Sequence, residues 1–316
     1  MRNKKNVKKT KDVEARLISL ADEVITAAKT NRSPAFQIPT RSLSNVNFNP
    51  KRGIIEMGKG KQERSFFNTG MAKKFMQTML VADALAELQR QDLTTSLREI
   101  YYRTKHTIQD SNENTFDSQG ESDPLIEDLE VTLDSLREEL HVRAENTGTI
   151  VGPVVFVDDG DTIDCTRLGK GGYSVPSIVE PEYIQIKKCT ADFLLLVEKG
   201  TQWNRLSEDK FWKKHNCVLL TGNGQPPRGV RRLARRLNED YKLPVYVLVD
   251  NDPWGYYIFS VVKQGSISLA YESQRMAVPQ AKFIGLSSGD PEEYGLPRNV
   301  GIKLNDKDVA RAKEIL

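Results

Sequence analysis

One stretch decides the fold of this chain, and between residues 193 and 255 it reads FLLLVEKGTQWNRLSEDKFWKKHNCVLLTGNGQPPRGVRRLARRLNEDYKLPVYVLVDNDPWG. Three short apolar segments alternate here with charged segments: Phe193–Val197, Cys217–Leu220 and Val245–Val249. Apolar runs of this length, separated by helices, are typical of strands that are buried on both faces of a parallel sheet. We therefore predict an α/β domain with a parallel sheet.

The neighbouring segments extend this prediction. Helical patterns cover Trp203–Lys214 and Gly229–Leu237, in the two intervals between the three strands. Two further apolar segments, Gly255–Val262 and Phe283–Leu286, are expected to continue the sheet as strands.

Two of the expected strands run into carboxylates: Glu198 follows the first strand, and Asp250 and Asp252 follow the third. Ligands bind at the carboxyl ends of parallel strands, and residues two apart in an extended chain point the same way. Lys199, the residue after Glu198, should therefore point away. We expect the three acids to converge and to need a cation, because like charges repel. An all-oxygen ligand set favours Mg²⁺, with Mn²⁺ as a substitute.

A second interpretation of the Asp-x-Asp pattern stays open. Aspartate caps helices and proline begins them, so the sequence from Asp250 to Pro253 is also typical of a turn into a helix. The second acid-terminated strand favours the metal interpretation. Phosphatases of the haloacid type also carry paired aspartates after a strand, so the acids alone do not choose the reaction.

Another candidate site lies on a helix expected from about Thr95 to His106, where Ser96 and Glu99 have the spacing of a capping box. One face of this helix is apolar and suited to burial: Leu97, Ile100 and Tyr101. Another face carries a tyrosine among basic residues: Arg98, Tyr102, Lys105 and His106. Nearby cations favour a phenolate, which is the better nucleophile, and they attract a phosphodiester. The alternative is that Tyr102 only touches DNA or lies on a solvated basic face.

The N-terminal part of the chain has a different character. Residues 1–12 are strongly basic and are expected to form a mobile tail, and an amphipathic helix is expected from Lys11 to Lys29. Residues 30–70 are rich in Ser, Asn, Pro and Gly, so we expect an irregular arm. The helix Ala72–Gln89 then precedes the tyrosine-bearing helix, and such a helical pair is a candidate helix-turn-helix.

A further helix and a hairpin follow the pair. Pro124 is expected to open the helix, whose apolar face carries five leucines: Leu125, Leu129, Leu133, Leu136 and Leu140. The alternating stretch Ile150–Ile163 predicts a β-hairpin closed by Asp158-Asp159-Gly160. Helices followed by such a ribbon predict a winged-helix (CAP-like) DNA-binding domain with the hairpin as its wing. The predicted fold class is thus multidomain α/β, with a winged-helix domain ahead of the parallel-sheet domain.

Five arginines share one face of the expected helix at Gly229–Leu237: Arg228, Arg231, Arg232, Arg235 and Arg236. Contact with phosphate, an ion-pair surface between protomers and an ordinary solvated face all stay open for this Arg228–Arg236 stripe.

Composition excludes several classes of protein. Of the 316 residues 38% are hydrophobic and 28% charged, an ordinary globular balance with a net charge of +3. No apolar run reaches the roughly 18 residues of a membrane span, and no apolar stretch follows the basic N-terminus as in a secretory signal. The three cysteines form no CxxC pair, which fits a reducing, cytoplasmic location. The absence of a Walker A pattern indicates that the chain does not hydrolyse ATP itself.

Several motifs together resemble one family. The segment Leu97–Arg103 (LREIYYR) is similar to the nucleophile motif of the A subunit of type IIB DNA topoisomerases (topoisomerase VI) and of the related meiotic double-strand-break transesterase. Val197–Gly200 and Val249–Gly255 resemble the two acidic motifs of the Toprim domain of that family. Gly160–Cys165 and Gly171–Tyr173 are also similar to family segments, and the resemblance covers about residues 70–300.

The resemblance implies a division of the chain and a role for each candidate residue. Residues 1–69 would be a basic tail, a helix and a partner-binding arm, residues 70–180 the winged-helix domain, and residues 181–316 the Toprim domain. Tyr102 would be the nucleophile, and Arg98 would position the scissile phosphate or stabilise its charge in the transition state. The metal ligands would be Glu198, Asp250 and Asp252. A slip of one residue in the helix phase would exchange Tyr101 and Tyr102.

The implied activity is that of an ATP-hydrolysing type II DNA topoisomerase, an isomerase that cuts both strands through 5′-phosphotyrosyl links with the help of Mg²⁺ and then religates them. The implied partners are double-stranded DNA, a second copy of the chain in a homodimer, and a GHKL-type B subunit that binds the ATP and completes an A2B2 heterotetramer. An archaeal, nucleoid-associated protein is favoured. Because family members usually continue beyond the position of Leu316, we expect this chain to be shorter than they are.

Two other functions use the same residues and stay open. In the first, the acids serve a metal-dependent Toprim nuclease or phosphatase that forms no covalent intermediate. In the second, the chain is a non-catalytic DNA-binding subunit, and removal of metal would leave its function intact.

Overall fold

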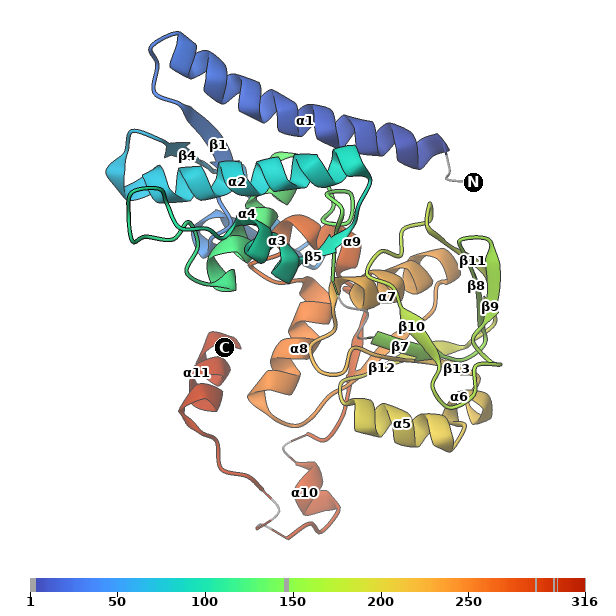
Figure 1. Cartoon of the computed structure of the whole chain (residues 1–316). Helices are drawn as coiled ribbons and strands as arrows, with labels where there is room; N and C mark the ends of the chain where they lie inside the picture. The colour runs from blue at the N-terminus through green and yellow to red at the C-terminus, as the bar shows by residue number, and fades with distance from the viewer. Residues whose placement is uncertain (1–3, 145–147, 288, 298, 300, 316) are drawn as a thin grey trace. The chain divides into compact units, whose positions relative to one another are not determined.

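The computed structural model describes residues 4–144, 148–287, 289–297, 299 and 301–315 (Figure 1). The chain divides into two compact units, the first made of residues 1–45 and 58–145 and the second of residues 46–57 and 146–316. The second unit thus takes in a short segment that lies within the first in sequence. Each unit has its own hydrophobic core.

The first unit is built mainly from four helices, α1 (Lys4–Lys29), α2 (Thr69–Gln91), α3 (Leu97–Thr104) and α4 (Gln119–Thr132). Its remaining elements are β1 (Ala35–Pro39), η1 (Leu43–Asn45), β4 (Lys61–Ser65), β5 (Thr95–Ser96) and β6 (Val142–Arg143). The predicted helices are present, although α4 begins before Pro124 instead of at it and ends at Thr132, so that Leu136 and Leu140 lie beyond it. The expected mobile tail is wrong from Lys4 onward, where α1 begins, and residues 1–3 lie outside the described residues.

The arm over residues 30–70 is not irregular as we expected. Strands β1 and β4 form an antiparallel pair, and β2 (Val46–Asn49) and β3 (Ile54–Met57) form another, which belongs to the second unit. An ion pair with a buried aspartate explains why the segment at β4 has a fixed conformation. Arg64 is 3% exposed and donates to the Asp128 carboxylate of α4 at 2.8 Å. Arg41 donates to the other oxygen of the same carboxylate at 2.9 Å. Because buried charges need such partners, the arm is fixed to α4.

The second unit contains the predicted parallel sheet. Six strands lie in the order β10-β7-β13-β12-β14-β15: β10 (Tyr173–Val175), β7 (Gly148–Val151), β13 (Cys217–Thr221), β12 (Phe193–Val197), β14 (Val245–Leu248) and β15 (Lys282–Ile284). The last four are parallel, whereas β7 pairs antiparallel with β13 and β10 antiparallel with β7. Strand β12 lies between β13 and β14, so its carboxyl end is flanked by theirs.

Helices cover both faces of this sheet, as its continuous apolar strands predict. Leu194 and Leu196 pack with α7 (Arg228–Tyr241) and α8 (Pro253–Gln264), whereas Leu195 and Val197 pack with α5 (Gly200–Glu208) and α6 (Phe211–Lys214). The helix expected over Trp203–Lys214 is therefore present as two shorter helices.

Two expectations about this unit were wrong. Gly255–Val262, expected to be a strand, lies within helix α8, because Asp252 caps that helix and Pro253 is its first residue. The hairpin closed by Asp159 and Gly160 forms between β8 (Val154–Asp158) and β9 (Asp161–Asp164), and β11 (Ile184–Cys189) joins it. We expected this hairpin to be the wing of the helical domain, but Val154 and Phe156 belong to the core of the second unit. The remaining elements of this unit are η2 (Ala270–Glu272), α9 (Ser273–Met276), α10 (Asp290–Glu293) and α11 (Asp306–Ile315).

The junction of β7 with β13 depends on a glycine. Gly152 has φ +133°, and a Cβ atom there would lie 2.5 Å from the carbonyl oxygen of Cys217 and 2.9 Å from Cα of Val218. We expect Gly152→Ala to destabilise the protein by roughly 2–4 kcal/mol, because both the backbone conformation and the neighbouring strand must change. Urea unfolding followed by circular dichroism measures this loss.

The matched control is Gly171→Ala, because a Cβ atom at Gly171 would have no heavy atom within 4 Å. Equal stability of the two variants would contradict the role proposed for Gly152 at the junction of β7 with β13.

Candidate active site

Helix α3 presents one tyrosine to solvent and buries its neighbour. The hydroxyl of Ser96 accepts a hydrogen bond from the backbone N–H of Glu99 at 3.2 Å and so caps the helix, as predicted. Ile100 is fully buried and Tyr101 is 9% exposed, whereas Tyr102 is 54% exposed. The predicted helix phase is confirmed, and Tyr102 carries the accessible phenol.

Arg98 lies one turn before Tyr102 and contacts it directly. Its Nη2 atom is 3.3 Å from the phenol oxygen of Tyr102, and its Cζ atom is 5.7 Å from the centre of the ring. This hydrogen bond, followed by the charge interaction with Tyr102, raises the pKa of Arg98. The phenol oxygen therefore has a permanent cation beside it at an exposed position.

The rest of the expected basic face is not assembled around Tyr102. Helix α3 ends at Thr104, and Lys105 has an extended backbone, so its side chain turns to the other tyrosine. The Lys105 amine donates to the hydroxyl of Tyr101 at 2.9 Å, and this bond raises the pKa of Lys105. The exposed His106 bonds through its backbone N–H to Thr115. Both residues follow the end of the helix instead of continuing its basic face, and Lys105 bonds to Tyr101 while its charge also acts on Tyr102.

The two acid-terminated strands bring Glu198 and Asp250 together. The backbone N–H of Glu198 donates to the carbonyl of Leu248 at 2.9 Å, which continues the pairing of β12 with β14 past the last strand residue. The N–H of Asp250 then donates to Oε2 of Glu198 at 3.1 Å. Both carboxylates thus lie at one end of adjacent parallel strands.

Asp252 caps a helix at the same edge of the sheet. Its Oδ1 atom accepts a hydrogen bond from the backbone N–H of Gly255 at 2.7 Å and caps α8. The capping interpretation of the Asp-x-Asp pattern is therefore right for Asp252, and that bond uses one of its two carboxylate oxygens.

The carboxylates act on one another through their charges. Burial is the main cause that raises the pKa of Glu198, and the negative charges of Asp250 and Asp252 raise it further. Both aspartates are thus near enough to Glu198 for their charges to act on it, in line with the expectation that the three acids lie at this edge.

Lys199 points into this group and not away from it, so that expectation was wrong. It is the N-cap residue of α5, and its Nζ atom forms an ion pair with Oδ2 of Asp250. The hydrogen bond to Asp250, more than any other interaction, raises the pKa of Lys199, and the charges of Glu198 and Asp252 act in the same direction.

The residue types at this edge fit a divalent cation. Carboxylate oxygens are the ligands that hard cations prefer, and the mutual repulsion seen at Glu198 is what a cation would relieve. Within the described part of the chain, no three His, Cys, Asp or Glu side chains already surround one point as ligands. The assignment of Glu198, Asp250 and Asp252 as metal ligands therefore stays a prediction.

Two glycines beside the acids permit close approaches, Gly255 to the backbone of Asp250 and Gly200 to the side chain of Asn223, and sequence reasoning did not identify either. A Cβ atom at Gly255 would lie 2.2 Å from the carbonyl oxygen of Asp250, and one at Gly200 would lie 2.2 Å from Oδ1 of Asn223. The motifs EKG and DPWG contain these glycines, but the spacing alone does not reveal which neighbour comes so near.

The first turn of α8 is held by α11, another contact that the sequence did not suggest. The Cζ atom of Arg311 lies 4.5 Å from the centre of the Trp254 ring and 4.2 Å from that of Tyr257. The indole N–H of Trp254 donates to Asp308 at 3.1 Å. These cation–π and hydrogen-bonding contacts fix the turn that directly follows Asp252.

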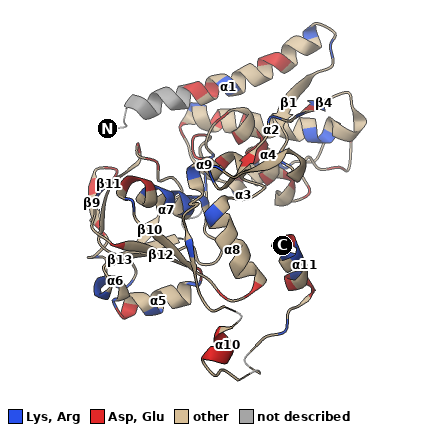
Figure 2. Ribbon diagram, turned by 180° about the vertical axis from the view of Figure 1, so that it is seen from behind, with Lys and Arg blue, Asp and Glu red and all other residues tan. Residues whose placement is uncertain are grey.

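Basic residues gather on α7 (Figure 2). The arginines of the Arg228–Arg236 stripe are buried or half-buried in the second unit and do not form a solvated face. Arg231 and Arg236 are each 4% exposed. Arg232 donates hydrogen bonds to Glu180 from both its Nε and Nη2 atoms, and Arg275 of α9 forms an ion pair with the same carboxylate. The arginines thus tie α7 to the segments around Glu180 and α9, and we make no assignment of phosphate binding to them.

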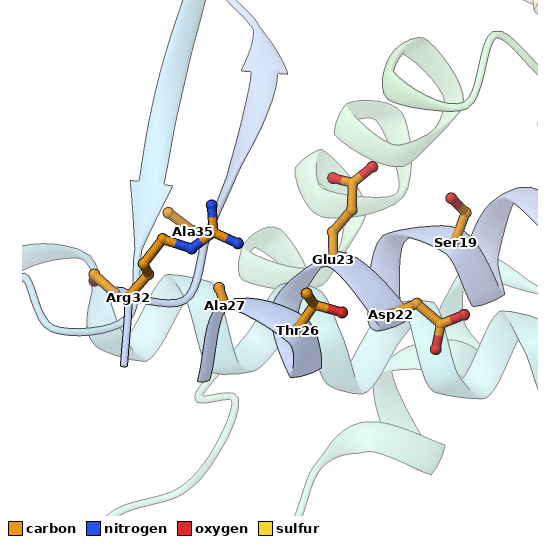
Figure 3. Close-up of a pocket in the computed structure, with 8 residues that line it drawn as sticks. Ser19, Asp22, Glu23, Thr26, Ala27, Arg32 and Ala35 are labelled. Carbon is orange, nitrogen blue, oxygen red and sulfur yellow. The ribbon is translucent and has the colours of Figure 1, made fainter. Parts of the chain in front are cut away.

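Two grooves in the first unit contain none of the candidate residues. One has a volume of about 460 Å³ and is lined mainly by polar residues of α1 and the segment after it, among them Asp22, Glu23 and Arg32 (Figure 3). The other, of about 590 Å³, is largely apolar and lies between α1 and α2.

In the described part of the chain, no helix is long and apolar enough to cross a membrane.

The first unit thus presents an exposed tyrosine beside an arginine, and the second unit a sheet edge with three acids, which are the two candidate sites of this multidomain α/β protein. Family comparisons agree. Residues 193–316 match the family described as the Toprim domain of the topoisomerase 6 A subunit and Spo11, and residues 73–142 match "Type IIB DNA topoisomerase". Residues 144–190 match "All-beta domain in DNA topoisomerase VI alpha subunit".

Whole-chain relatives point the same way. The chain is 43% identical to the type 2 DNA topoisomerase 6 A subunit of Pyrococcus horikoshii over 92% of its own length and 75% of that of the relative. It is 41% identical to the protein of the same name from Aeropyrum pernix, over 90% and 77% of the two chains. It is 34% identical to the DNA topoisomerase 6 A3 subunit of Oryza sativa, over 93% and 65%. The chain belongs to the family of topoisomerase VI A subunits.

The arginine network around Glu180 predicts a pH-dependent contribution to stability. Burial alone would raise the pKa of Glu180, but hydrogen bonds and charges from Arg232 and Arg275 outweigh it and lower that pKa. A carboxylate with a lowered folded-state pKa stabilises the protein above its unfolded-state pKa, and this contribution is lost as the pH falls through the folded-state value. We expect Glu180→Gln to be less stable than wild type at pH 7 and the difference to shrink towards pH 3.

Urea unfolding at a series of pH values measures this difference. Glu182→Gln, which removes an exposed carboxylate two residues away, is the control and should show little change at any pH. A constant difference between wild type and Glu180→Gln across the pH range would contradict the proposed charge interaction.

Proposed function

We propose that this chain is the DNA-cleaving subunit of a type IIB DNA topoisomerase and that Tyr102 is its nucleophile. The observation that carries the proposal is the contrast between the two adjacent phenols. Tyr102 is 54% exposed and its oxygen lies 3.3 Å from Arg98, whereas Tyr101 is 9% exposed and bonds to Lys105. Only the first can meet a DNA backbone without unfolding the helix.

The proposed step is a transesterification. The phenol oxygen of Tyr102 attacks the phosphorus in line with the 3′-oxygen, a 5′-phosphotyrosyl bond forms, and the bond from phosphorus to the 3′-oxygen breaks. The proton that Tyr102 loses is balanced by the one that the leaving oxygen gains. Arg98 stabilises the phenolate before attack and the charge on the non-bridging oxygens afterwards. Because the ester bond is exchanged and not hydrolysed, religation by the reverse step needs no external energy.

Membership of the family and the Toprim domain imply dependence on a divalent metal. We propose that Glu198, Asp250 and Asp252 would hold Mg²⁺, or Mn²⁺ in its place, which supplies charge neutralisation at the phosphodiester and the leaving oxygen. The acids lie in the second unit and the tyrosine in the first.

The proposed partners follow from the family. Membership among the type IIB topoisomerase A subunits implies DNA binding and a partner B subunit. We propose double-stranded DNA as substrate, a homodimer in which the tyrosine of one protomer acts with the acids of the other, and an A2B2 complex. In that complex the B subunit binds ATP and meets the arm formed by residues 1–69. We also propose a cytoplasmic, nucleoid-associated location.

The identity of the nucleophile predicts the outcome of a cleavage assay. Wild type, Tyr102→Phe, Tyr101→Phe and Asp250→Ala are incubated with end-labelled duplex DNA, Mg²⁺, ATP and the B subunit, and the reaction is stopped with SDS. We expect protein attached to 5′ ends for wild type and Tyr101→Phe. Tyr102→Phe, which lacks the attacking oxygen, and Asp250→Ala, which lacks a metal ligand, should give no adduct.

Other results of the same assay would favour the alternatives. Cleavage that survives Tyr102→Phe and leaves free 5′-phosphates would overturn the transesterase in favour of a metal-dependent nuclease. DNA binding without cleavage by wild type, unchanged after metal removal, would indicate a non-catalytic subunit.

Arg98 has its own expected outcome. Arg98→Met removes the cation beside the attacking oxygen and should lower the rate of adduct formation by about 10²–10³-fold, the usual effect of removing one donor that stabilises transition-state charge. Arg103→Met is the matched control, because Arg103 lies in the same helix but pairs with Glu99 at 3.3 Å. Equal rates for the two variants would show that Arg98 is not part of the reaction.

A further inference from the structure

A basic side chain already lies among the acids of the candidate metal site. The Nζ atom of Lys199 forms an ion pair with Oδ2 of Asp250, and the charges of Glu198 and Asp252 also act on it. Among the described residues, no other Lys or Arg side chain forms an ion pair with these three carboxylates. The negative charge of Asp250, which a metal ion would offset, is thus offset by Lys199 of the chain itself.

The surroundings of Lys199 suit a reversible contact. Its backbone is fixed at the N-cap of α5, next to the close approach of Gly200 to Asn223. Its side chain is 53% exposed, whereas that of Asp250 is 25% exposed. A long, flexible and half-exposed side chain can leave the carboxylate without any change in the fold, and an exposed ion pair costs little to break.

We propose that Lys199 is an internal counter-cation that neutralises the acidic edge in the metal-free protein and that a divalent ion must displace from Asp250. The inference rests on the proposed metal site and adds a residue that opposes metal binding.

The test compares Lys199→Met with Lys214→Met in the full chain without DNA. Both variants lose one lysine from the second unit, but Lys214 lies in α6, just before the amino end of β13 and so at the opposite edge of the sheet. Mn²⁺ serves as the probe, and isothermal titration calorimetry measures its affinity. We expect Lys199→Met to bind Mn²⁺ about three- to ten-fold more tightly than wild type and Lys214→Met to bind it equally.

Stability without metal supplies a second readout. Lys199→Met leaves three carboxylates without their counter-cation, so we expect it to unfold at a lower urea concentration than wild type. Asp250→Asn removes the partner, and in that background Lys199→Met should have a much smaller effect; this double-mutant cycle isolates the pair. Added Mn²⁺ should stabilise Lys199→Met more than it stabilises wild type.

Failure of this inference can be told from failure of the proposed function. If wild type binds Mn²⁺, Asp250→Asn abolishes the binding, and Lys199→Met binds no more tightly than Lys214→Met, the metal site stands and the role of Lys199 is overturned. If wild type binds no Mn²⁺ and Asp250→Asn changes nothing, the metal site itself is refuted, and the inference falls with it.

Discussion

The placement of three carboxylates at the end of adjacent buried strands is the constraint on this edge of the second unit. The register of β12 and β14 leaves Glu198 and Asp250 next to each other, where burial and neighbouring charges raise the pKa of Glu198. The surrounding structure holds this unfavourable arrangement in place. Asp252 is fixed by capping α8, Gly255 lets the backbone of α8 come close to Asp250, and the ammonium of Lys199 offsets part of the charge. A group of carboxylates whose negative charges are crowded in this way is well suited to bind a metal ion.

The tyrosine site follows from a simpler principle, the burial of one face of a short helix. Ile100 and Tyr101 belong to the core of the first unit, so the next residue, Tyr102, must face outward. Arg98 then reaches it because residues four apart lie on one face of a helix. The two adjacent phenols differ in exposure and in the cation that each contacts: Tyr101 anchors the helix, and Tyr102 is the proposed nucleophile.

The sequence predicted those parts of the structure that depend on local pattern. Continuous apolar strands, the cap at Ser96 and the phase of Tyr102 all express a simple periodicity, and the structure confirms them. The failures arose where tertiary contacts override the pattern. Lys199 was expected to follow strand alternation, but the chain leaves the strand at that residue and attraction by Asp250 decides its direction. Strand β4 is polar and was not predicted from the sequence, because the partner of the buried Arg64 lies 64 residues away at Asp128.

The central claim is that the reactive phenol is the exposed member of the Tyr101–Tyr102 pair. The most direct measurement is mass spectrometry of the covalent complex, after nuclease trimming of the DNA and digestion with trypsin. Cleavage after Arg98 and Arg103 releases the peptide Glu99–Arg103, which contains both tyrosines, and fragmentation locates the attached nucleotide. The account predicts a nucleotide joined through its 5′-phosphate to Tyr102 and an unmodified Tyr101. A nucleotide on Tyr101, or on neither tyrosine in a complex that cleaves DNA, would contradict it.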